Sequence, residues 1–489
     1  MNRLYNQLNN IKNIRLWACM LLFLLPACSE DFLDVDPQGQ RKTEDFFVTA
    51  EDAIKSVTAC YGHLNTWKIN GFAHLALTSI SSDDADKGSV PGDGSFLNEY
   101  DNFTFTSTQF VLDEYWTGQY AGINLCNQSI ENIPAIQMDP GLKSRLIAEA
   151  KFIRAYHYFN LVRAFGDVPK VDHLPVTPEE LNPERAPKDE IYILIEQDLN
   201  EAISILPVSY GSENTGRATK GAALAMMAKV KMYQEDWAEV LSLTEQVMAM
   251  PYALVNDYYQ VFRVTNENNS ESIFEVQAQA NPNDCGAMSQ YSEVQAVRNQ
   301  FGWGFNVPSI DLENAYEPGD KRKEATLLKR GETTPEGDVI ISTAPNPMYN
   351  QKVYVPASWP NPCGYGYGRD KNRIVLRLGE IYLIHAEAAN ELGQTAKALT
   401  SLNRIRTRAG LAPVTTTEQN QLRMAIWKER RAELAMEDDR FFDLVRQGRA
   451  GEVLRALGKN FVDGKNEVFA IPQRQIDLSG GKLSQNPGY

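Results

Sequence analysis

The stretch that most constrains the fold is residues 149–169, EAKFIRAYHYFNLVRAFGDVP. Apolar side chains recur there at spacings of three and four, and aromatic side chains fill the adjacent stripe, so most of a helical circumference is apolar or aromatic. A helix of this kind must be packed on several sides. Gly166 can adopt the left-handed conformation that ends a helix, and Pro169 cannot continue one, so the helix is predicted to end near Phe165.

Helical periodicity returns in other parts of the chain, often as two helices joined by a short turn. The clearest pair covers residues 218–250, where small residues let a neighbouring helix approach closely, Asp236 can cap the second helix and Pro251 ends it. This succession resembles a tetratricopeptide unit, and such units stack because each buries the face that its neighbour exposes. The other predicted helices cover residues 49–64, 112–133, 188–205 and, as a second pair, 377–409.

These patterns predict a mainly α-helical fold of about four tetratricopeptide-like helix pairs with an inserted loop-rich subdomain. The predicted organisation is a signal segment, an N-terminal region with helix pairs, a loop-rich ligand-binding segment and a C-terminal region with a helix pair, at residues 1–27, 28–250, 251–376 and 377–489. Long irregular stretches inside a compact protein are usually functional. The loop-rich segment and the polar, glycine-rich residues 65–108 are therefore expected to hold the ligand.

The N-terminus has the order of a secretory signal: basic residues, a ten-residue apolar run at 16–25, then Pro-Ala-Cys. The run is too short to cross a bilayer, for which about twenty residues are needed. Residues 1–27 are expected to be absent from the mature protein. The segment LPAC resembles a bacterial lipobox, in which Cys28 becomes the acylated N-terminus; the alternative is an ordinary cleavage site that precedes a cysteine.

The formal net charge of the 489 residues is −15, and the composition, with 43% hydrophobic residues, fits a globular protein. Polyanions and anionic membrane surfaces are poor partners for a body of this charge, so no nucleic acid is expected to bind.

Cysteine spacing does not indicate a disulfide framework or a metal site. Cys19 leaves with the signal segment and Cys28 is the lipidation site, which leaves Cys60, Cys126, Cys285 and Cys363. An export route permits three pairings of these four. Free thiols are the favoured interpretation, because Cys60 and Cys126 lie among apolar neighbours in helical patterns. The chain has no CxxC or HExxH motif, so no zinc site is expected.

Several segments, in their order along the chain, resemble the SusD/RagB family. They are FLD at 32–34, the aromatic helix followed by LVR and GDVP, GWG at 302–304 with Pro308 and DLENAYE, ERRAEL with DRFFD at 439–443, and the ending IPQRQIDLSGGKLSQNPGY. Together they run from about residue 25 to residue 489 and are far more specific than any single motif.

The resemblance implies an outer-membrane lipoprotein that holds glycans for a SusC-like TonB-dependent transporter, without enzymatic activity. The segment Ser29-Glu30-Asp31 places two acids directly after the lipid site, which is similar to the export signal of surface lipoproteins in the bacteria that carry such proteins. The expected location is the outer membrane, facing the exterior. The family also implies that the helical face docks on the transporter barrel.

Aromatic side chains in the two loop regions are the candidate ligand contacts, because a sugar ring stacks its C–H face on a flat aromatic ring. The candidates are Trp67, Phe72, Tyr100, Tyr291, Trp303, Trp359, Tyr365 and Tyr367. A packing role for Trp303 is as well supported as binding, since it belongs to the GWG segment of the family. Tyr365 and Tyr367 alternate with glycines, so an extended segment would present both rings on one side.

The sequence SDDADKGSVPGDGS is acid-rich and contains glycines, so its oxygen ligands could hold Ca²⁺. The acids concerned are Asp83, Asp84, Asp86 and Asp93. The glutamate of an EF-hand is missing, and a solvated turn is the favoured interpretation. No other cofactor is expected.

Three alternatives remain open from the sequence. A RagB-like protein would carry peptides, and aromatic loops do not separate sugar from peptide. A protein-only helical scaffold would bind no glycan. A glycoside hydrolase would need two carboxylates across a cleft. Glu429 and Glu433 are better explained as a salt-bridged helix face, and no GxSxG or phosphate-loop motif occurs.

Overall fold

The computed structural model describes residues 46–177, 179–283 and 285–489. The signal segment, the lipidation candidate Cys28 and the acidic residues after it lie outside the described residues. Within the described part, no helix combines the length and the apolar character that a membrane crossing requires. Residues 49–489 form one compact unit.

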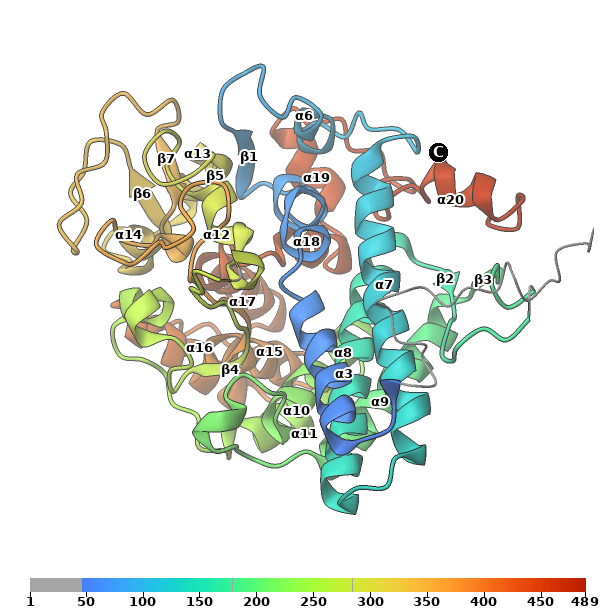
Figure 1. The fold of residues 1–489 in the computed structure, drawn as a ribbon. Coiled ribbons are helices and arrows are strands. Elements are labelled where there is room, and N and C mark those ends of the chain that lie inside the picture. The colour runs from blue at the N-terminus through green and yellow to red at the C-terminus, as the bar shows by residue number, and fades with distance from the viewer. Residues whose placement is uncertain (1–45, 178, 284) are drawn as a thin grey trace, which may run out of the picture. The chain divides into compact units, whose positions relative to one another are not determined.

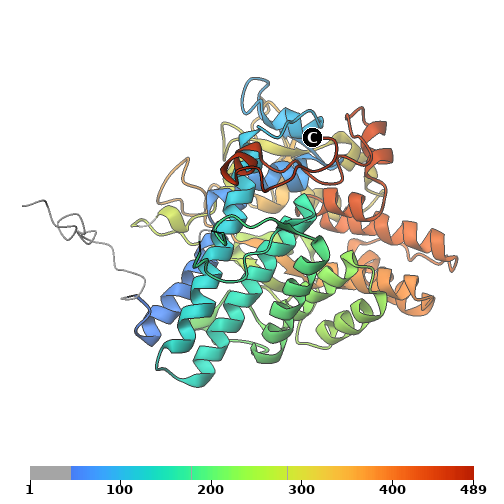
Figure 2. The ribbon, with the colours of Figure 1, turned by 90° about the vertical axis from the view of Figure 1, so that its right-hand side faces the viewer.

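The compact unit is mainly α-helical, as predicted, and its long helices pack in succession (Figure 1). They are α3 (Ala50–His63), α7 (Phe110–Asn132), α8 (Pro140–Phe165), α9 (Lys188–Ile205), α10 (Lys220–Tyr233), α11 (Trp237–Met248), α15 (Leu378–Glu391), α16 (Thr395–Ala409) and α17 (Gln419–Leu434). Each of the pairs α3–α7, α8–α9, α10–α11 and α15–α16 is in contact, and α11 also packs on α15. Figure 2 shows the helices coloured from blue to green as neighbouring rods, which is the expected tetratricopeptide-like stack.

Helix α8 confirms the prediction of a helix packed on several sides. From Leu146 to Phe165 nearly every side chain is buried, and the helix ends at Phe165 because Gly166 has a φ of 71°. Its start lies at Pro140, earlier than expected. The side chain of Asp139 accepts a hydrogen bond from the backbone N–H of Leu142, which caps that first turn.

The remaining elements are short. The helices are α4 (Trp67–Asn70), α5 (Phe72–Leu75), η3 (Ala76–Ile80), α6 (Leu97–Asp101), α12 (Gln290–Gln295), α13 (Ile310–Ala315), α14 (Arg322–Thr326), α18 (Arg440–Arg446), α19 (Ala450–Ala456) and α20 (Gln473–Leu478). Within the described residues the strands form four antiparallel pairs: β1 (Ala85–Gly88) with β5 (Phe305–Pro308), β2 (Val168–Pro169) with β3 (Arg185–Ala186), β4 (Ser272–Val276) with β8 (Arg373–Arg377), and β6 (Leu327–Lys329) with β7 (Met348–Asn350).

The loop-rich subdomain has an apolar core of its own. Its members come from residues 296–354 and are Ala296, Val297, Phe301, Val307, Leu328, Ile340, Ala344, Tyr349 and Tyr354. The helix stack has a separate, much larger core. Strand β8 runs directly into α15, so the subdomain is connected to the stack at a buried position.

Candidate functional site

Strand pairing joins the two loop regions in which the sequence predicted the ligand. Ala85 of β1 lies opposite Pro308 of β5, and Gly88 lies opposite Phe305. Residues that flank these strands are therefore neighbours in space although more than two hundred positions separate them in the sequence. The structure thus brings parts of residues 65–108 and 251–376 together, and the expectation that they hold the ligand stays a prediction.

Three of the predicted aromatic side chains form one cluster, which we call the aromatic cluster: Trp67, Phe72 and Trp303. The ring centroids of Trp67 and Trp303 are 5.9 Å apart, those of Trp67 and Phe72 are 5.1 Å apart, and those of Phe72 and Trp303 are 6.0 Å apart. All three are only partly buried. Trp67 and Phe72 lie on α4 and α5, and Trp303 lies just before β5.

Further phenylalanines extend the aromatic cluster towards α7. Phe96 contacts Phe72 at 5.7 Å between centroids, and Phe110 contacts Phe96 at 4.8 Å. Phe110 is 48% exposed at the start of α7. Sequence reasoning missed both residues, since one lies in an irregular segment and the other reads as the first turn of an amphipathic helix.

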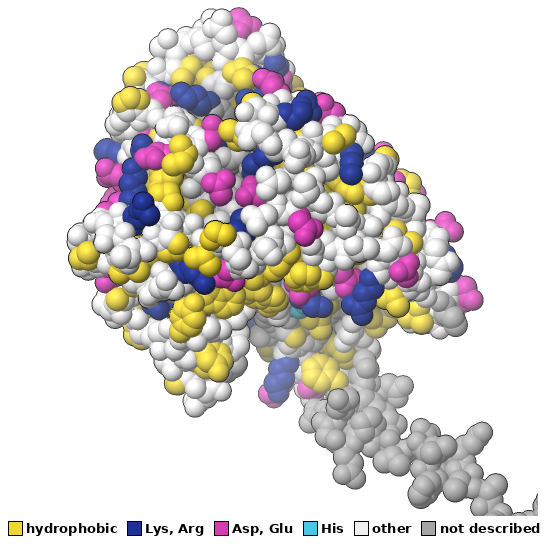
Figure 3. Space-filling view, turned by 90° about the horizontal axis from the view of Figure 1, so that it is seen from above, with side chains coloured by type: hydrophobic (Ala, Val, Ile, Leu, Met, Phe, Trp, Pro, Cys, Tyr) yellow, Lys and Arg dark blue, Asp and Glu magenta, His cyan; other side chains and the backbone are white. Residues whose placement is uncertain are grey.

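A glycine-rich loop presents two more rings beside the cluster. We call residues 364–368 the tyrosine loop. Its Tyr365 is 65% exposed and Tyr367 is 56% exposed. The hydroxyl of Tyr365 donates to the carbonyl oxygen of Gly302 at 3.5 Å, so the loop approaches the residue before Trp303. Figure 3, seen from above Figure 1, shows hydrophobic side chains gathered in patches among charged ones.

Charged and polar groups border the rings. Nη1 of Arg298 donates to Oδ2 of Asp93 at 2.5 Å, to Oγ of Ser89 at 2.7 Å and to the carbonyl oxygen of Trp303 at 3.0 Å. Arg298 and Asp93 both keep solvent-exposed surface. Burial raises the pKa of Tyr365, and the carboxylate of Glu293 raises it further, which marks these groups as near neighbours.

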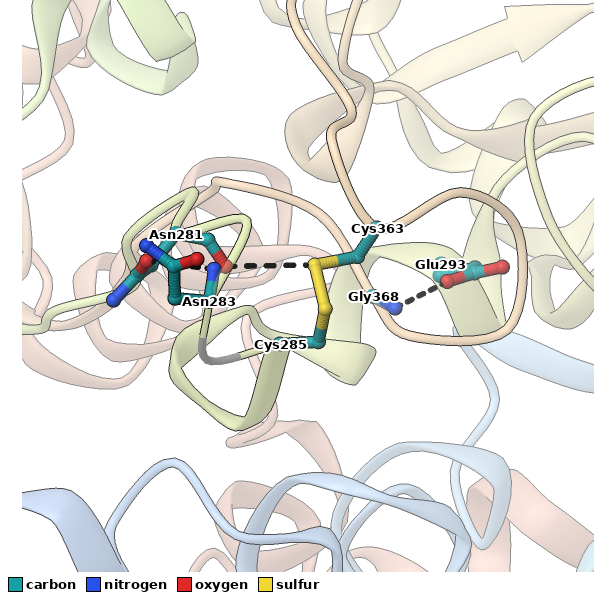
Figure 4. Close-up of a disulfide and its surroundings, with 6 residues drawn as sticks. All are labelled: Asn281, Asn283, Cys285, Glu293, Cys363 and Gly368. Atoms are coloured by element: carbon teal, nitrogen blue, oxygen red, sulfur yellow. Dashed lines mark hydrogen bonds between the residues drawn. A yellow bond between two sulfur atoms is a disulfide. The ribbon is translucent and has the colours of Figure 1, made fainter.

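A disulfide between Cys285 and Cys363 ties the tyrosine loop to the segment before α12 (Figure 4). The prediction of no disulfide is therefore wrong. Cys285 begins the short 3-10 helix η8 (Cys285–Ala287) and Cys363 lies in a turn, so no sequence periodicity indicates which residues are their neighbours. The expectation for Cys60 and Cys126 is confirmed, because both are buried free thiols.

Two predicted contact residues are not accessible to a ligand. Tyr100 is fully buried, with its ring stacked on that of Phe105 at 4.9 Å. Tyr291 is 5% exposed and its hydroxyl donates to Asp438. These two assignments are corrected to packing roles. Trp359 is half-buried, and among the described residues no ring contact joins it to the aromatic cluster; its role in binding stays a prediction.

The acidic loop is not the solvated turn that the sequence favoured. Asp83 and Asp84 are buried and form ion pairs with Arg440 and Arg431. Burial opposes ionisation, yet the guanidinium of Arg440 lowers the pKa of Asp83 to about 2. Asp86 is exposed. In the described ranges no three His, Cys, Asp or Glu side chains come together as metal ligands.

Glu429 and Glu433 form salt bridges, as predicted, but the face of α17 that carries them is buried. Glu433 is fully buried and pairs with Arg377, Arg408 and Arg322. Glu429 pairs with Arg322 and with Arg406. The oxygens of both carboxylates face guanidinium groups, which is a structural arrangement and not that of a general acid and base.

Known proteins match nearly the whole length of this chain. The profile of the SusD family matches residues 270–489, and a profile described as starch-binding associating with outer membrane matches residues 31–232. SusD-like protein P2 of Formosa agariphila is 27% identical over 98% of this chain and 100% of its own length.

Solved structures show the same fold. A laminarin-binding SusD-like protein superposes with a TM-score of 0.78 at 30% identity, covering 90% of this chain and 100% of that chain. Surface glycan-binding protein A from Bacteroides fluxus superposes with a TM-score of 0.76 at 25% identity and the same coverage. The sequence motifs, the helix stack and these matches agree, and the chain belongs to the SusD family.

Proposed function

We propose that the protein captures a glycan without changing it chemically. The observation that carries this proposal is the convergence of Trp67, Trp303 and Tyr365 from three distant segments of the chain. Their rings supply stacking surface for the C–H faces of sugars. The guanidinium of Arg298 and the carboxylate of Asp93 border the rings, where they can hydrogen-bond to hydroxyl groups.

A laminarin-type glucan is the ligand class that we propose. Support comes from the 30% identical relative, whose name states laminarin binding. The ring planes add a physical argument, since Trp303 is tilted by 48° from Trp67 and by 58° from Phe72. Tilted rings match a chain whose successive sugars turn, as in a β-1,3-glucan, better than the flat ribbon of a β-1,4-glucan.

Anchoring and delivery follow the family pattern in this proposal. Cys28 in the LPAC segment carries the lipid, and the acids after it direct the protein to the outer face of the outer membrane. The bound oligosaccharide then passes to a SusC-like TonB-dependent transporter. The support is the family profile whose description names association with the outer membrane.

Calorimetry with laminarihexaose, cellohexaose and maltohexaose tests the ligand class. The protein should bind laminarihexaose most tightly. Trp67→Ala, Trp303→Ala and Tyr365→Ala should each weaken binding by at least about tenfold, or ~1.4 kcal/mol. Trp237→Ala is the control, because that half-buried indole lies on α11, outside the aromatic cluster. Equal affinity of all three variants and the wild type would refute this site.

The rival functions give different results in the same preparation. A hydrolase would generate new reducing ends from laminarin, and none are expected. A peptide carrier of the RagB type would bind oligopeptides and ignore all three hexasaccharides. A protein-only scaffold would bind neither class.

A further inference from the structure

One short segment contacts all three parts of the chain that supply the aromatic rings. This segment, residues 285–293, is called the hub segment and comprises Cys285 and most of α12. Its first contact is with the Trp67 region. The side-chain amide of Asn65, two positions before Trp67, donates to the carbonyl oxygens of Ala287 and Met288 at 3.3 and 3.4 Å.

The second contact fixes the backbone at Trp303. The backbone N–H of Trp303 donates to the carbonyl oxygen of Glu293 at 2.9 Å. The preceding Gly302 passes so close to that oxygen that a Cβ built on it would lie 1.9 Å away. Only glycine allows this approach, so the position of Trp303 depends on the backbone of Glu293.

The third contact is with the tyrosine loop and uses the side chain of the same residue. Glu293 accepts hydrogen bonds from the N–H of Gly366 at 2.6 Å and from the N–H of Gly368 at 2.5 Å, one on each carboxylate oxygen. Ser289 and Arg369 exchange two backbone hydrogen bonds at 2.8 Å each. The Cys285–Cys363 disulfide closes the other end of the loop (Figure 4).

Glu293 is only 1% exposed, and among the described residues no lysine or arginine forms an ion pair with it. A buried carboxylate needs hydrogen-bond donors, and here the amides of the tyrosine loop supply them. Both amides belong to glycines with φ above 90°, a conformation that Gly366 and Gly368 adopt without strain. The loop conformation and the Glu293 side chain therefore stabilise each other.

We propose that Glu293 is the positioning residue of the glycan site. Its backbone holds Trp303, and its carboxylate holds the loop that carries Tyr365 and Tyr367, so one residue sets the distance between the two groups of rings. The rings then occupy their places before a ligand arrives, which lowers the ordering cost of binding. This inference rests on the proposed function and adds a residue that does not itself touch the glycan.

The test compares Glu293→Gln with the wild type by two independent measurements. Glutamine keeps the shape but replaces one acceptor oxygen with an N–H₂ group that faces a loop N–H. Hydrogen exchange of the peptide that covers residues 361–369 should become faster. The affinity for laminarihexaose should fall by about tenfold, or ~1.4 kcal/mol, with the melting temperature nearly unchanged.

A double-mutant comparison separates positioning from general destabilisation. In the background Tyr365→Ala/Tyr367→Ala, Glu293→Gln should cause no further loss of affinity, because the rings that it positions are gone. The proposal would be overturned if Glu293→Gln weakened laminarihexaose binding by the same factor in both backgrounds.

A matched control is Glu275→Gln on β4. This buried glutamate also accepts amide hydrogens, from the backbone of Asn268 and from the side chain of Asn372, but it lies outside the hub segment. It should leave the affinity and the exchange of residues 361–369 unchanged.

The outcomes distinguish this inference from the proposed function. If the wild-type protein binds none of the hexasaccharides, the proposed function fails, whatever the exchange data show. If the wild type binds and Glu293→Gln accelerates exchange without weakening binding, the function stands and the positioning role is refuted.

Discussion

The guanidinium of Arg440 donates two hydrogen bonds to the carboxylate of Asp83, at 2.7 and 2.8 Å, across a separation of 357 residues in the sequence. Both side chains are buried. The pair joins α18 near the C-terminus to Asp83, two positions before β1, and so fixes the strand that brings the two loop regions together.

Removing one partner of this pair should be strongly destabilising. Arg440→Ala leaves the buried carboxylate of Asp83 without its main cationic partner, and the unfolding free energy is expected to fall by about 3–5 kcal/mol. Urea unfolding followed by circular dichroism measures it. Lys55→Ala breaks the exposed pair with Glu51 and serves as the control, with almost no change expected. An equal effect of both variants would contradict the role assigned to Arg440.

The same pair predicts a pH dependence. Because the pKa of Asp83 is lowered to about 2 in the folded protein, its ion pair stabilises fully above the unfolded pKa, near pH 4, and this contribution is lost as the pH falls through about 2. The stability difference between wild type and Asp83→Asn should therefore be large at pH 6 and shrink by about 2 kcal/mol towards pH 2. Denaturation series at several pH values give this difference directly. A constant difference would argue against the ionised pair.

Glu433→Gln should destabilise the helix stack more than a typical surface substitution. The change removes the negative charge that faces Arg377, Arg408 and Arg322, and three buried guanidinium groups then repel one another. A loss of about 3–5 kcal/mol is expected in chemical denaturation. Glu190→Gln, on the exposed side of α9, should have little effect. The interpretation fails if the two variants unfold alike.

Loss of the disulfide should loosen the tyrosine loop. Cys285→Ser/Cys363→Ser removes a link that spans 78 residues, and a decrease of about 2–4 kcal/mol in unfolding free energy is expected. Glycan affinity should fall as well, because the tyrosine loop samples more conformations once the disulfide no longer holds it. Reducing agent should reproduce the effect in the wild type and change nothing in the variant. Any response of the variant to reductant would point to another cause.

Gly302→Ala tests the close approach at the hub segment. The added methyl group would collide with the carbonyl oxygen of Glu293, so Trp303 must shift. Glycan affinity should fall by about tenfold, or ~1.4 kcal/mol, in calorimetry. Gly92→Ala provides the comparison, because nothing lies within 4 Å of a Cβ there. Unchanged binding by Gly302→Ala would show that the position of Trp303 is not critical.

The sequence predicted the helices well because their signals are local. Gly166 and Pro169 indicate the end of α8. The small residues of α10 and the capping residue Asp236 before α11 indicate the α10–α11 pair. The start of α8 was missed, since the polar first turns before residue 149 do not share the all-round apolar pattern. Its cap at Asp139 was a usable signal.

The site was predicted only in part, because it depends on contacts between distant residues. Trp67, Phe72 and Trp303 were found by residue type, but Tyr100 and Tyr291 look the same in the sequence and are buried. Composition does not say which aromatic residue of a loop faces inward. Glu293 carried no sequence signal at all, as its role arises from backbone N–H groups more than seventy positions away.

The pairing of β1 with β5 has a consequence for biogenesis. The two strands come from opposite halves of the sequence. The contact between the indole rings of Trp67 and Trp303 therefore cannot form until translation has passed well beyond residue 300. Products that stop before this point would lack the contact between Trp67 and Trp303, so carbohydrate binding through these two rings requires a chain that has been translated and folded past it.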